Sequence, residues 1–83
     1  MKVRQSMEYN LGSNIRNLRK SRLFTQEQVV AKMQLLGIDI SRSTYSQIEC
    51  GTYNIKVEEL LALCEIFHCD VNTIFKDIQL ERK

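Results

Sequence analysis

The residues best suited to chemistry form one cluster in the C-terminal third of the chain. Cys64, His68 and Cys69 fall within six positions, and cysteine and histidine are both common metal ligands. A zinc site of this kind needs two ligand pairs, but the sequence has no C-x-x-C and no second histidine. We therefore expect no metal site and no cofactor. Cys50 stands apart from the cluster and is either a free structural thiol or an exposed redox thiol.

Catalysis finds no support in the residue types present. The sequence has one histidine, no glycine-rich phosphate loop and no pair of acids beside a nucleophile. Its 83 residues suffice for one small domain and leave no room for a catalytic domain beside a binding domain. We predict a non-enzyme with a single domain over residues 1–83, whose core covers about 11–76 with short tails at both ends.

Composition and charge further limit the kinds of protein that this sequence can encode. Apolar residues make up 43% of the chain and charged residues 27%, which is typical of a compact domain. The longest apolar run falls far short of the roughly 18 residues of a membrane helix, and no apolar stretch follows the basic N-terminus. We expect a cytoplasmic protein outside the membrane. The first 42 residues carry eight Lys and Arg against three Asp and Glu, which is a weak indication of a polyanion-binding face.

The spacing of apolar residues predicts short helices at the start of the chain. Leu11, Ile15 and Leu18 recur at spacings of four and three, which predicts a helix at about 11–21. Thr25 and Gln28 have the T-x-x-Q form of a capping box, so a second helix starts there. We expect it to fade near residue 35 or 36, before a glycine, and to bury Val29, Val30 and Met33.

Three further helices follow in the same way. Ser41 can cap a helix at about 42–50, which Gly51 would close. A fourth helix at about 57–67 is predicted to bury the stripe Val57, Leu60, Leu61, Cys64 and Phe67. Asp70 can cap a short fifth helix that turns inward Val71, Ile74 and Phe75, with Ile78 and Leu80 continuing its apolar side. The predicted fold class is therefore all-α.

The helix expected at 42–50 divides into two faces on a helical wheel. A polar arc of about 140° holds Arg42, Ser43, Ser46, Gln47 and Cys50. Tyr45 and Ile48 lie on the other side, where we predict that they join the core. Glu49 falls at the border between the two faces.

These elements together resemble the phage repressor/Cro-like helix-turn-helix family, also called the xenobiotic-response-element family. The resemblance covers residues 15–75 and rests on five segments in register: 15–19, 25–29, 41–51, 60–64 and 71–75. It implies a five-helix domain in which residues 42–50 form the recognition helix. The connection over residues 34–40 is about five residues longer than the common form, so we expect a lengthened turn between helices two and three.

The resemblance implies that the recognition helix enters the major groove of double-stranded DNA. The base-reading positions are then Arg42, Ser43, Ser46 and Gln47. An arginine can donate two hydrogen bonds to guanine, and a glutamine can pair in bidentate fashion with adenine. Tyr45 and Ile48 correspond to apolar residues of the family, in agreement with the wheel.

Phosphate contacts are expected around the recognition helix. Gln26, at the N-terminus of the second helix, would meet a phosphate through its amide, while Thr25 is a helix cap first and a phosphate ligand second. Weaker phosphate candidates, each explained equally well as an exposed polar residue, are Arg16, Lys20, Thr52, Asn54 and Lys56.

Arg19 and Glu49 resemble a family pair that joins the first helix to the third. An unpaired carboxylate at the border of the core would be costly, whereas a paired one is tolerable. We interpret this pair as structural, holding the recognition helix in place.

We conclude from the sequence that the protein is a sequence-specific transcriptional regulator, most simply a repressor. One helix reads only about four or five base pairs, so we expect a homodimer on a near-palindromic operator, formed either in solution or only on DNA. The alternative is a protein-interaction module, such as an antitoxin-type partner-binding domain. Such an interface favours aromatic and aliphatic anchors, whereas the third helix offers Arg42 and Gln47.

Overall fold

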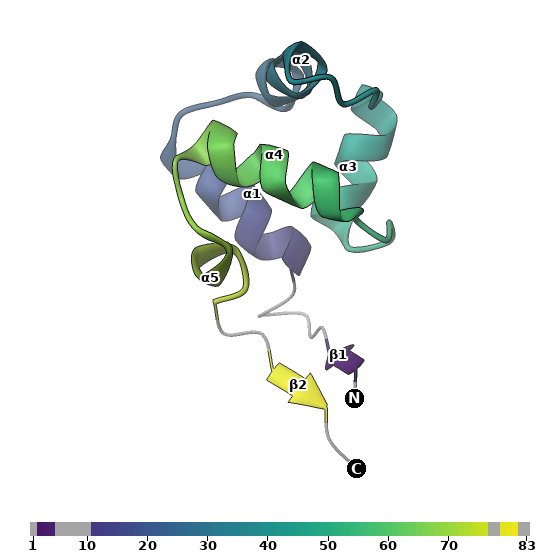
Figure 1. The fold of residues 1–83 in the computed structure, drawn as a ribbon, viewed down its shortest axis with the longest axis vertical. Helices are drawn as coiled ribbons and strands as arrows, with labels where there is room; N and C mark the ends of the chain where they lie inside the picture. Colours follow the sequence, from purple (N-terminus) through teal and green to yellow (C-terminus); the bar gives the residue numbers. More distant parts are fainter. Residues whose placement is uncertain (1, 5–10, 77–78, 82–83) are drawn as a thin grey trace.

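Five helices surround a single cluster of buried side chains in the computed structural model of the protein (Figure 1). The structure describes residues 2–4, 11–76 and 79–81. The helices are α1 (Leu11–Ser21), α2 (Gln26–Leu35), α3 (Arg42–Cys50), α4 (Val57–Phe67) and α5 (Val71–Ile74). The predicted all-α, five-helix architecture is confirmed, and a two-stranded sheet accompanies it.

The sheet joins the two ends of the described chain. Strand β1 (Lys2–Arg4) pairs antiparallel with β2 (Gln79–Glu81), and Val3 lies opposite Leu80. The prediction that Leu80 continues the apolar side of the fifth helix is therefore wrong, while Ile78 lies outside the described residues. α5 ends at Ile74, and the backbone of residues 79–81 pairs with a segment from the other end of the sequence, which a local pattern does not reveal.

Local capping interactions set the helix ends where the sequence predicts them. The Thr25 hydroxyl accepts from the Gln28 N–H at 3.1 Å, and the Gln28 side chain accepts from the Thr25 N–H at 2.8 Å, which completes the capping box. Ser41 caps α3 through the Thr44 N–H at 3.1 Å. Gly51 ends α3 at φ +81°, a left-handed conformation that glycine adopts without steric cost.

The core is built from one face of each helix. Ile15, Met33, Tyr45, Leu63 and Phe67 are fully buried. The predicted burial of Tyr45 is thus confirmed, and Ile48, also predicted as core, is 3% exposed. Burying these side chains removes apolar surface from water, which is the main favourable term in folding.

The buried face of α4 differs from the predicted stripe. Val57 is 71% exposed and Leu61 is 55% exposed, although both were expected to be buried. The predicted burial of Phe67 is confirmed, and Leu60 and Cys64 are half-buried. The other buried residues of the helix are Glu59, Ala62, Leu63 and Ile66. Leucine and isoleucine occupy both sides of this helix, so its periodicity allows more than one orientation, and packing against α2 and α5 selects one of them.

The lengthened turn between α2 and α3 covers residues 36–41 and is anchored at several points. Gly37 has φ +88°, and the Ile38 N–H bonds the Met33 carbonyl at 3.0 Å. The Gln34 amide donates to the Ile40 carbonyl at 3.1 Å, while the Ile40 side chain is 4% exposed. The added residues are therefore packed and hydrogen-bonded, and they hold α3 at a defined position relative to α2.

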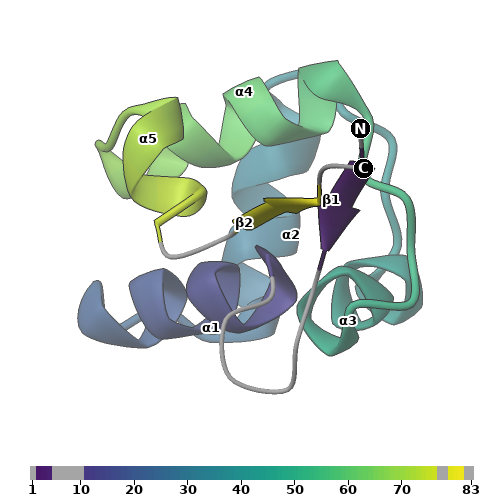
Figure 2. The same ribbon diagram turned by 90° about the horizontal axis from the view of Figure 1, so that it is seen from below.

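α1 and α3 approach each other closely at Gly12. Figure 2 shows the start of α1 lying beside α3. A Cβ atom on Gly12 would lie 2.5 Å from the carbonyl oxygens of both Ile48 and Glu49. Only glycine fits this contact without moving a helix, and its small size lets α1 lie against the last turn of α3.

Candidate nucleic-acid interface

The outer face of α3 is polar and carries short side chains beside one arginine and one glutamine. Arg42, Ser43 and Gln47 are exposed, and Ser46 is half-buried. The opposite side of the helix is fixed in the core by Tyr45 and buried by neighbouring helices. The four residues expected to read bases are thus displayed together on one rigid helix.

Gln26 connects the start of α2 to both ends of α3. Its Nε2 donates to Oε1 of Glu49 at 3.0 Å, and its Oε1 accepts from Nε of Arg42 at 3.0 Å. From the sequence we expected only that Gln26 faces a phosphate. In the structure this amide also bonds Arg42 and Glu49, so the Gln26 side chain positions Arg42.

Glu49 is the centre of this arrangement. Nε of Arg19 lies 2.7 Å from Oε2 of Glu49, and the two side chains are 12% and 3% exposed. Nη2 of Arg19 donates to Oε1 at 3.2 Å, and the Tyr45 hydroxyl donates to Oε2 at 2.6 Å. With the Gln26 amide, three side chains satisfy both carboxylate oxygens. The structure therefore brings Arg19 and Glu49 together, and it ties them to a tyrosine and a glutamine that the sequence did not link to them.

The protonation of these groups follows from their surroundings. Burial by itself would raise the pKa of Glu49, but hydrogen bonds from Arg19, Tyr45 and Gln26 outweigh it and hold the pKa below its ordinary value. Burial, together with the hydrogen bond to Glu49, raises the pKa of Tyr45. The hydrogen bond to Glu49 raises the pKa of Arg19. At neutral pH the carboxylate is ionised and the other two groups keep their protons.

Arg42 has a second, weaker neighbour on α2. Its Nη1 lies 3.6 Å from Oε2 of Glu27, and the side chains are 57% and 78% exposed. An exposed ion pair of this length contributes at most about 1 kcal/mol to stability. It nevertheless places an acidic side chain next to the arginine that is expected to read a base.

The weaker phosphate candidates lie on separate elements. Arg16 and Lys20 are exposed on α1, and Asn54 and Lys56 are exposed between α3 and α4. The backbone N–H of Lys56 donates to Oε1 of Glu59 at 2.8 Å, and this bond does not involve the side-chain ammonium group of Lys56. Thr52 donates its N–H to the Gln47 carbonyl at 3.1 Å and so helps to end α3. Their role in binding phosphate stays a prediction.

Two positioning residues had no indication in the sequence. Nδ2 of Asn14 donates to the carbonyls of Ile74 at 2.8 Å and Lys76 at 2.7 Å, which joins α1 to the end of α5. Nε of Arg22 donates to the Phe67 carbonyl at 2.8 Å, which joins the end of α1 to the end of α4. All three bonds connect residues far apart in the sequence, so no local motif predicts them.

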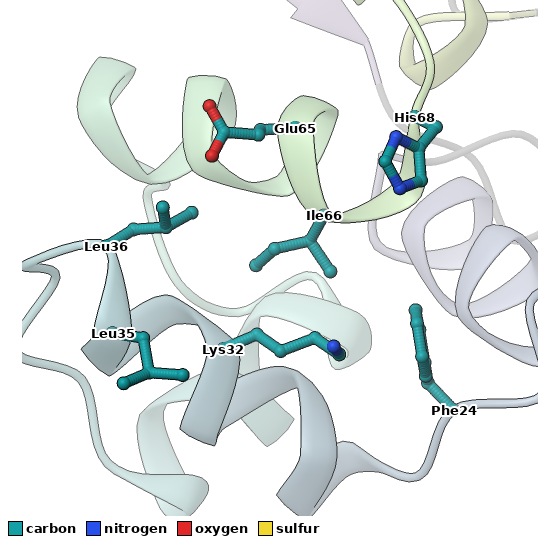
Figure 3. A pocket seen from close by; sticks show the side chains of 7 residues that line it. All are labelled: Phe24, Lys32, Leu35, Leu36, Glu65, Ile66 and His68. Carbon is teal, nitrogen blue, oxygen red and sulfur yellow. The ribbon is translucent and has the colours of Figure 1, made fainter.

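A groove between α2 and α4 is a second surface feature (Figure 3). It is lined by Phe24, Lys32, Leu35, Leu36, Glu65, Ile66 and His68. Nζ of Lys32 stands 5.0 Å from the centre of the Phe24 ring, a cation–π contact. None of the lining residues belongs to α3, so the groove is separate from the candidate base-reading face.

The described residues contain no group of three or more His, Cys, Asp or Glu side chains placed to hold a metal ion. In the same part of the chain, no helix combines the length and the apolar character needed to cross a membrane.

Five helices with α3 packed across α2 and exposing a polar face define the class of helix-turn-helix DNA-binding proteins. The chain belongs to the helix-turn-helix domain family, whose model matches residues 12–80. The resemblance to the phage repressor/Cro-like branch is thereby confirmed.

The fold is also similar to a solved structure. The crystal structure of the restriction-modification controller protein C.AhdI from Aeromonas hydrophila matches with a TM-score of 0.69 and 22% sequence identity, over 78% of this chain and 91% of that chain. Comparison with curated protein sequences gives no match.

Proposed function

We propose that this protein is a transcriptional repressor that binds double-stranded DNA by inserting α3 into the major groove. The observation that carries the proposal is the division of α3. Its outer face offers Arg42, Ser43 and Gln47 to the surroundings, while Tyr45 and Glu49 lock its inner face to the core. A rigid helix with a short polar face fits the major groove, which displays a distinct donor and acceptor pattern for each base pair.

The hydrogen bonds within the site leave the right donors free. Arginine has five N–H donors, and Arg42 uses Nε to bond Gln26. Its terminal nitrogens have only the exposed Glu27, 3.6 Å from Nη1, as an ion-pair partner, so both can turn to O6 and N7 of a guanine. The amide of Gln26 has two hydrogens and gives one to Glu49, so the other remains for a phosphate oxygen. Gln47 is proposed to read an adenine, with Ser43 and Ser46 beside it.

Selection from a pool of random duplexes, followed by sequencing of the bound fraction, tests these assignments. Arg42→Ala and Gln47→Ala should each flatten the preference at single operator positions, because a bidentate base contact contributes roughly 1–3 kcal/mol of discrimination. Gln26→Ala should weaken binding to all sequences through the lost phosphate contact and, because the same amide positions Arg42, should reduce the preference only at the operator position that Arg42 reads. An unchanged motif for Arg42→Ala contradicts the assignment of Arg42.

We further propose that the protein acts as a homodimer. One α3 reaches about four or five base pairs, which does not single out one site among a million or more competitors. Two copies related by a twofold axis would place their recognition helices about 34 Å apart and read a near-palindromic operator. Protection of a single asymmetric half-site by the full-length protein would contradict the dimer.

A second candidate function is binding of a protein partner. The apolar side chains that border the groove between α2 and α4 favour it, since Leu35 is 87% exposed and Leu36 is 43% exposed. This surface does not compete with the α3 face, and the same selection experiment separates the two functions. Absence of any enriched duplex would favour the protein partner.

A further inference from the structure

The end of α4 brings two thiols together. The Cys69 N–H bonds the Cys64 carbonyl at 3.0 Å, and the His68 N–H bonds the Glu65 carbonyl at 3.2 Å. His68 itself is left-handed, with φ 54° and ψ 51°. These features define a Schellman motif, in which the side chain just past the turn contacts the side chain that begins the last helical turn. Here these two positions are occupied by Cys69 and Cys64.

The backbone bond at the helix end places the two cysteines next to each other. Beside the larger effect of burial, Cys69 lowers the pKa of Cys64, and Cys64 raises the pKa of Cys69, as expected for neighbouring thiols. Both cysteines are reduced and half-buried, and both pack against the edge of the core. They are therefore held side by side without being sealed from solvent.

We propose that Cys64 and Cys69 form a reversible disulfide within the chain by exchange with a small-molecule disulfide. In the first step the Cys64 thiolate attacks one sulfur of the reagent, and a mixed disulfide forms as one small thiolate leaves. In the second step Cys69 loses its proton, attacks the Cys64 sulfur and displaces the second small thiolate. Two protein thiols are oxidised, and one reagent disulfide is reduced to two small thiols.

Charged neighbours and burial set the rate of this exchange. Burial raises the pKa of both thiols, while the guanidinium of Arg22, bonded to the nearby Phe67 carbonyl at 2.8 Å, partly counters this at Cys69. Asp70 lies on the same side and acts in the opposite direction. Attack requires the thiolate, so exchange is slow at neutral pH. The equilibrium ratio of disulfide to dithiol depends instead on the geometry of the two cysteines.

The disulfide would fix the junction between α4 and α5. Asp70 follows Cys69 directly and caps α5 through the Thr73 N–H at 2.9 Å. A covalent link from Cys64 to Cys69 would hold this cap in place relative to α4. The inference does not depend on DNA binding.

The experiment uses the full chain with Cys50→Ser, which removes the exposed third cysteine. The protein is equilibrated in buffers of reduced and oxidised glutathione, quenched with iodoacetamide and digested with trypsin. Residues 57–76 contain no internal Lys or Arg, so both cysteines appear in one peptide. We expect this peptide to lose two hydrogens in mass and to carry no iodoacetamide.

Two controls make the result decisive. The wild-type chain shows that the reagent is active, because Cys50 should become glutathionylated under the same conditions. Cys69→Ser should stop at a mixed disulfide on Cys64. The ratio of disulfide to dithiol should be at least about tenfold higher in the native protein than in urea, because the helix end holds the thiols together.

Three outcomes would overturn the proposal. They are two alkylated cysteines in the oxidising buffer, a stable glutathione adduct on either cysteine, or an equal ratio in native and urea-denatured protein.

Discussion

The guanidinium Nε of Arg42 donates a hydrogen bond to Oε1 of Gln26 at 3.0 Å. Through the other end of the same amide, Arg42 is linked to Glu49 and from there to Arg19. The side chain proposed to read a base is thus the outer end of a chain of hydrogen bonds that begins at the core. Substitutions at the core end of this series of hydrogen bonds should affect stability, and substitutions at the Arg42 end should affect DNA binding.

Arg19→Met should cost about 3–5 kcal/mol of unfolding free energy, measured by urea melts. It leaves the carboxylate of Glu49, which is 3% exposed as a side chain, without its cation. Glu49→Gln should cost less, about 1–3 kcal/mol, because the amide oxygen can still accept a hydrogen bond. The matched control is Arg16→Met on the exposed side of α1, which should change stability by less than about 0.5 kcal/mol. Equal effects at positions 16 and 19 would rule out a structural role for the pair.

Acid should destabilise the protein in a window set by Glu49. Because the folded pKa of this carboxyl is lowered, its contribution is complete above the ordinary carboxyl pKa of 4.5 and is lost as the pH falls through the folded pKa. Asp70 acts in the same direction, since hydrogen bonds from Thr73 lower its pKa. Urea melts from pH 7 to pH 3 should show a flat region and then a decline. Glu49→Gln should reduce the slope of that decline by up to about 1.4 kcal/mol per pH unit, and an unchanged slope would contradict the assignment.

Gly12→Ala should destabilise the protein by about 1–3 kcal/mol or more, because the new methyl group meets two backbone carbonyls of α3 at 2.5 Å. Gly37→Ala is the comparison. A Cβ atom at position 37 would have no neighbour within 4 Å, but the backbone there has φ +88°, a conformation that costs alanine about 1–2 kcal/mol. The two variants should differ in DNA affinity more than in stability, since only Gly12→Ala displaces α3. If Gly12→Ala bound DNA with full affinity, the close approach of α1 to α3 would not be needed for DNA binding.

Glu27→Gln should raise DNA affinity a few-fold without changing the preferred sequence. The substitution frees Arg42 from an exposed acid 3.6 Å away and removes one negative charge near the proposed phosphate contacts. Glu65→Gln, an exposed acid on α4 beside the groove, is the matched control and should have a smaller effect. Mobility shifts at two salt concentrations measure both variants. Equal effects of Glu27→Gln and Glu65→Gln would mean that Glu27 acts only through net charge.

Truncation after Lys76 should weaken cooperative operator binding while leaving the helical circular-dichroism signal largely intact. It deletes β2 and leaves β1 without its partner, but it spares all five helices. Ile74 is fully buried in the core, so the truncation tests only the segment after α5 for the proposed dimer contact. Footprinting on the selected operator tests the expectation, and full cooperativity in the truncated protein would place the dimer contact elsewhere.

The sequence predicted the helices well because their ends depend on neighbours within a few residues. Thr25 with Gln28, Ser41 and Gly51 act through caps and left-handed turns that are complete in the local chain. The polar arc of α3 follows equally from spacing, because a helix places residues at i, i+1, i+4 and i+5 on one side. The family resemblance then supplied a function for that arc.

Contacts between distant segments could not be obtained in this way, and these were decided by the tertiary structure alone. The orientation of α4 depended on which of its two apolar sides met α2 and α5, and Val57 and Leu61 were left outside. The bridge from Glu49 through Gln26 to Arg42 and the pairing of β1 with β2 join residues far apart in the chain. Periodicity reports which side of an element is apolar, whereas packing of all elements at once decides which surfaces meet and which polar groups must satisfy one another.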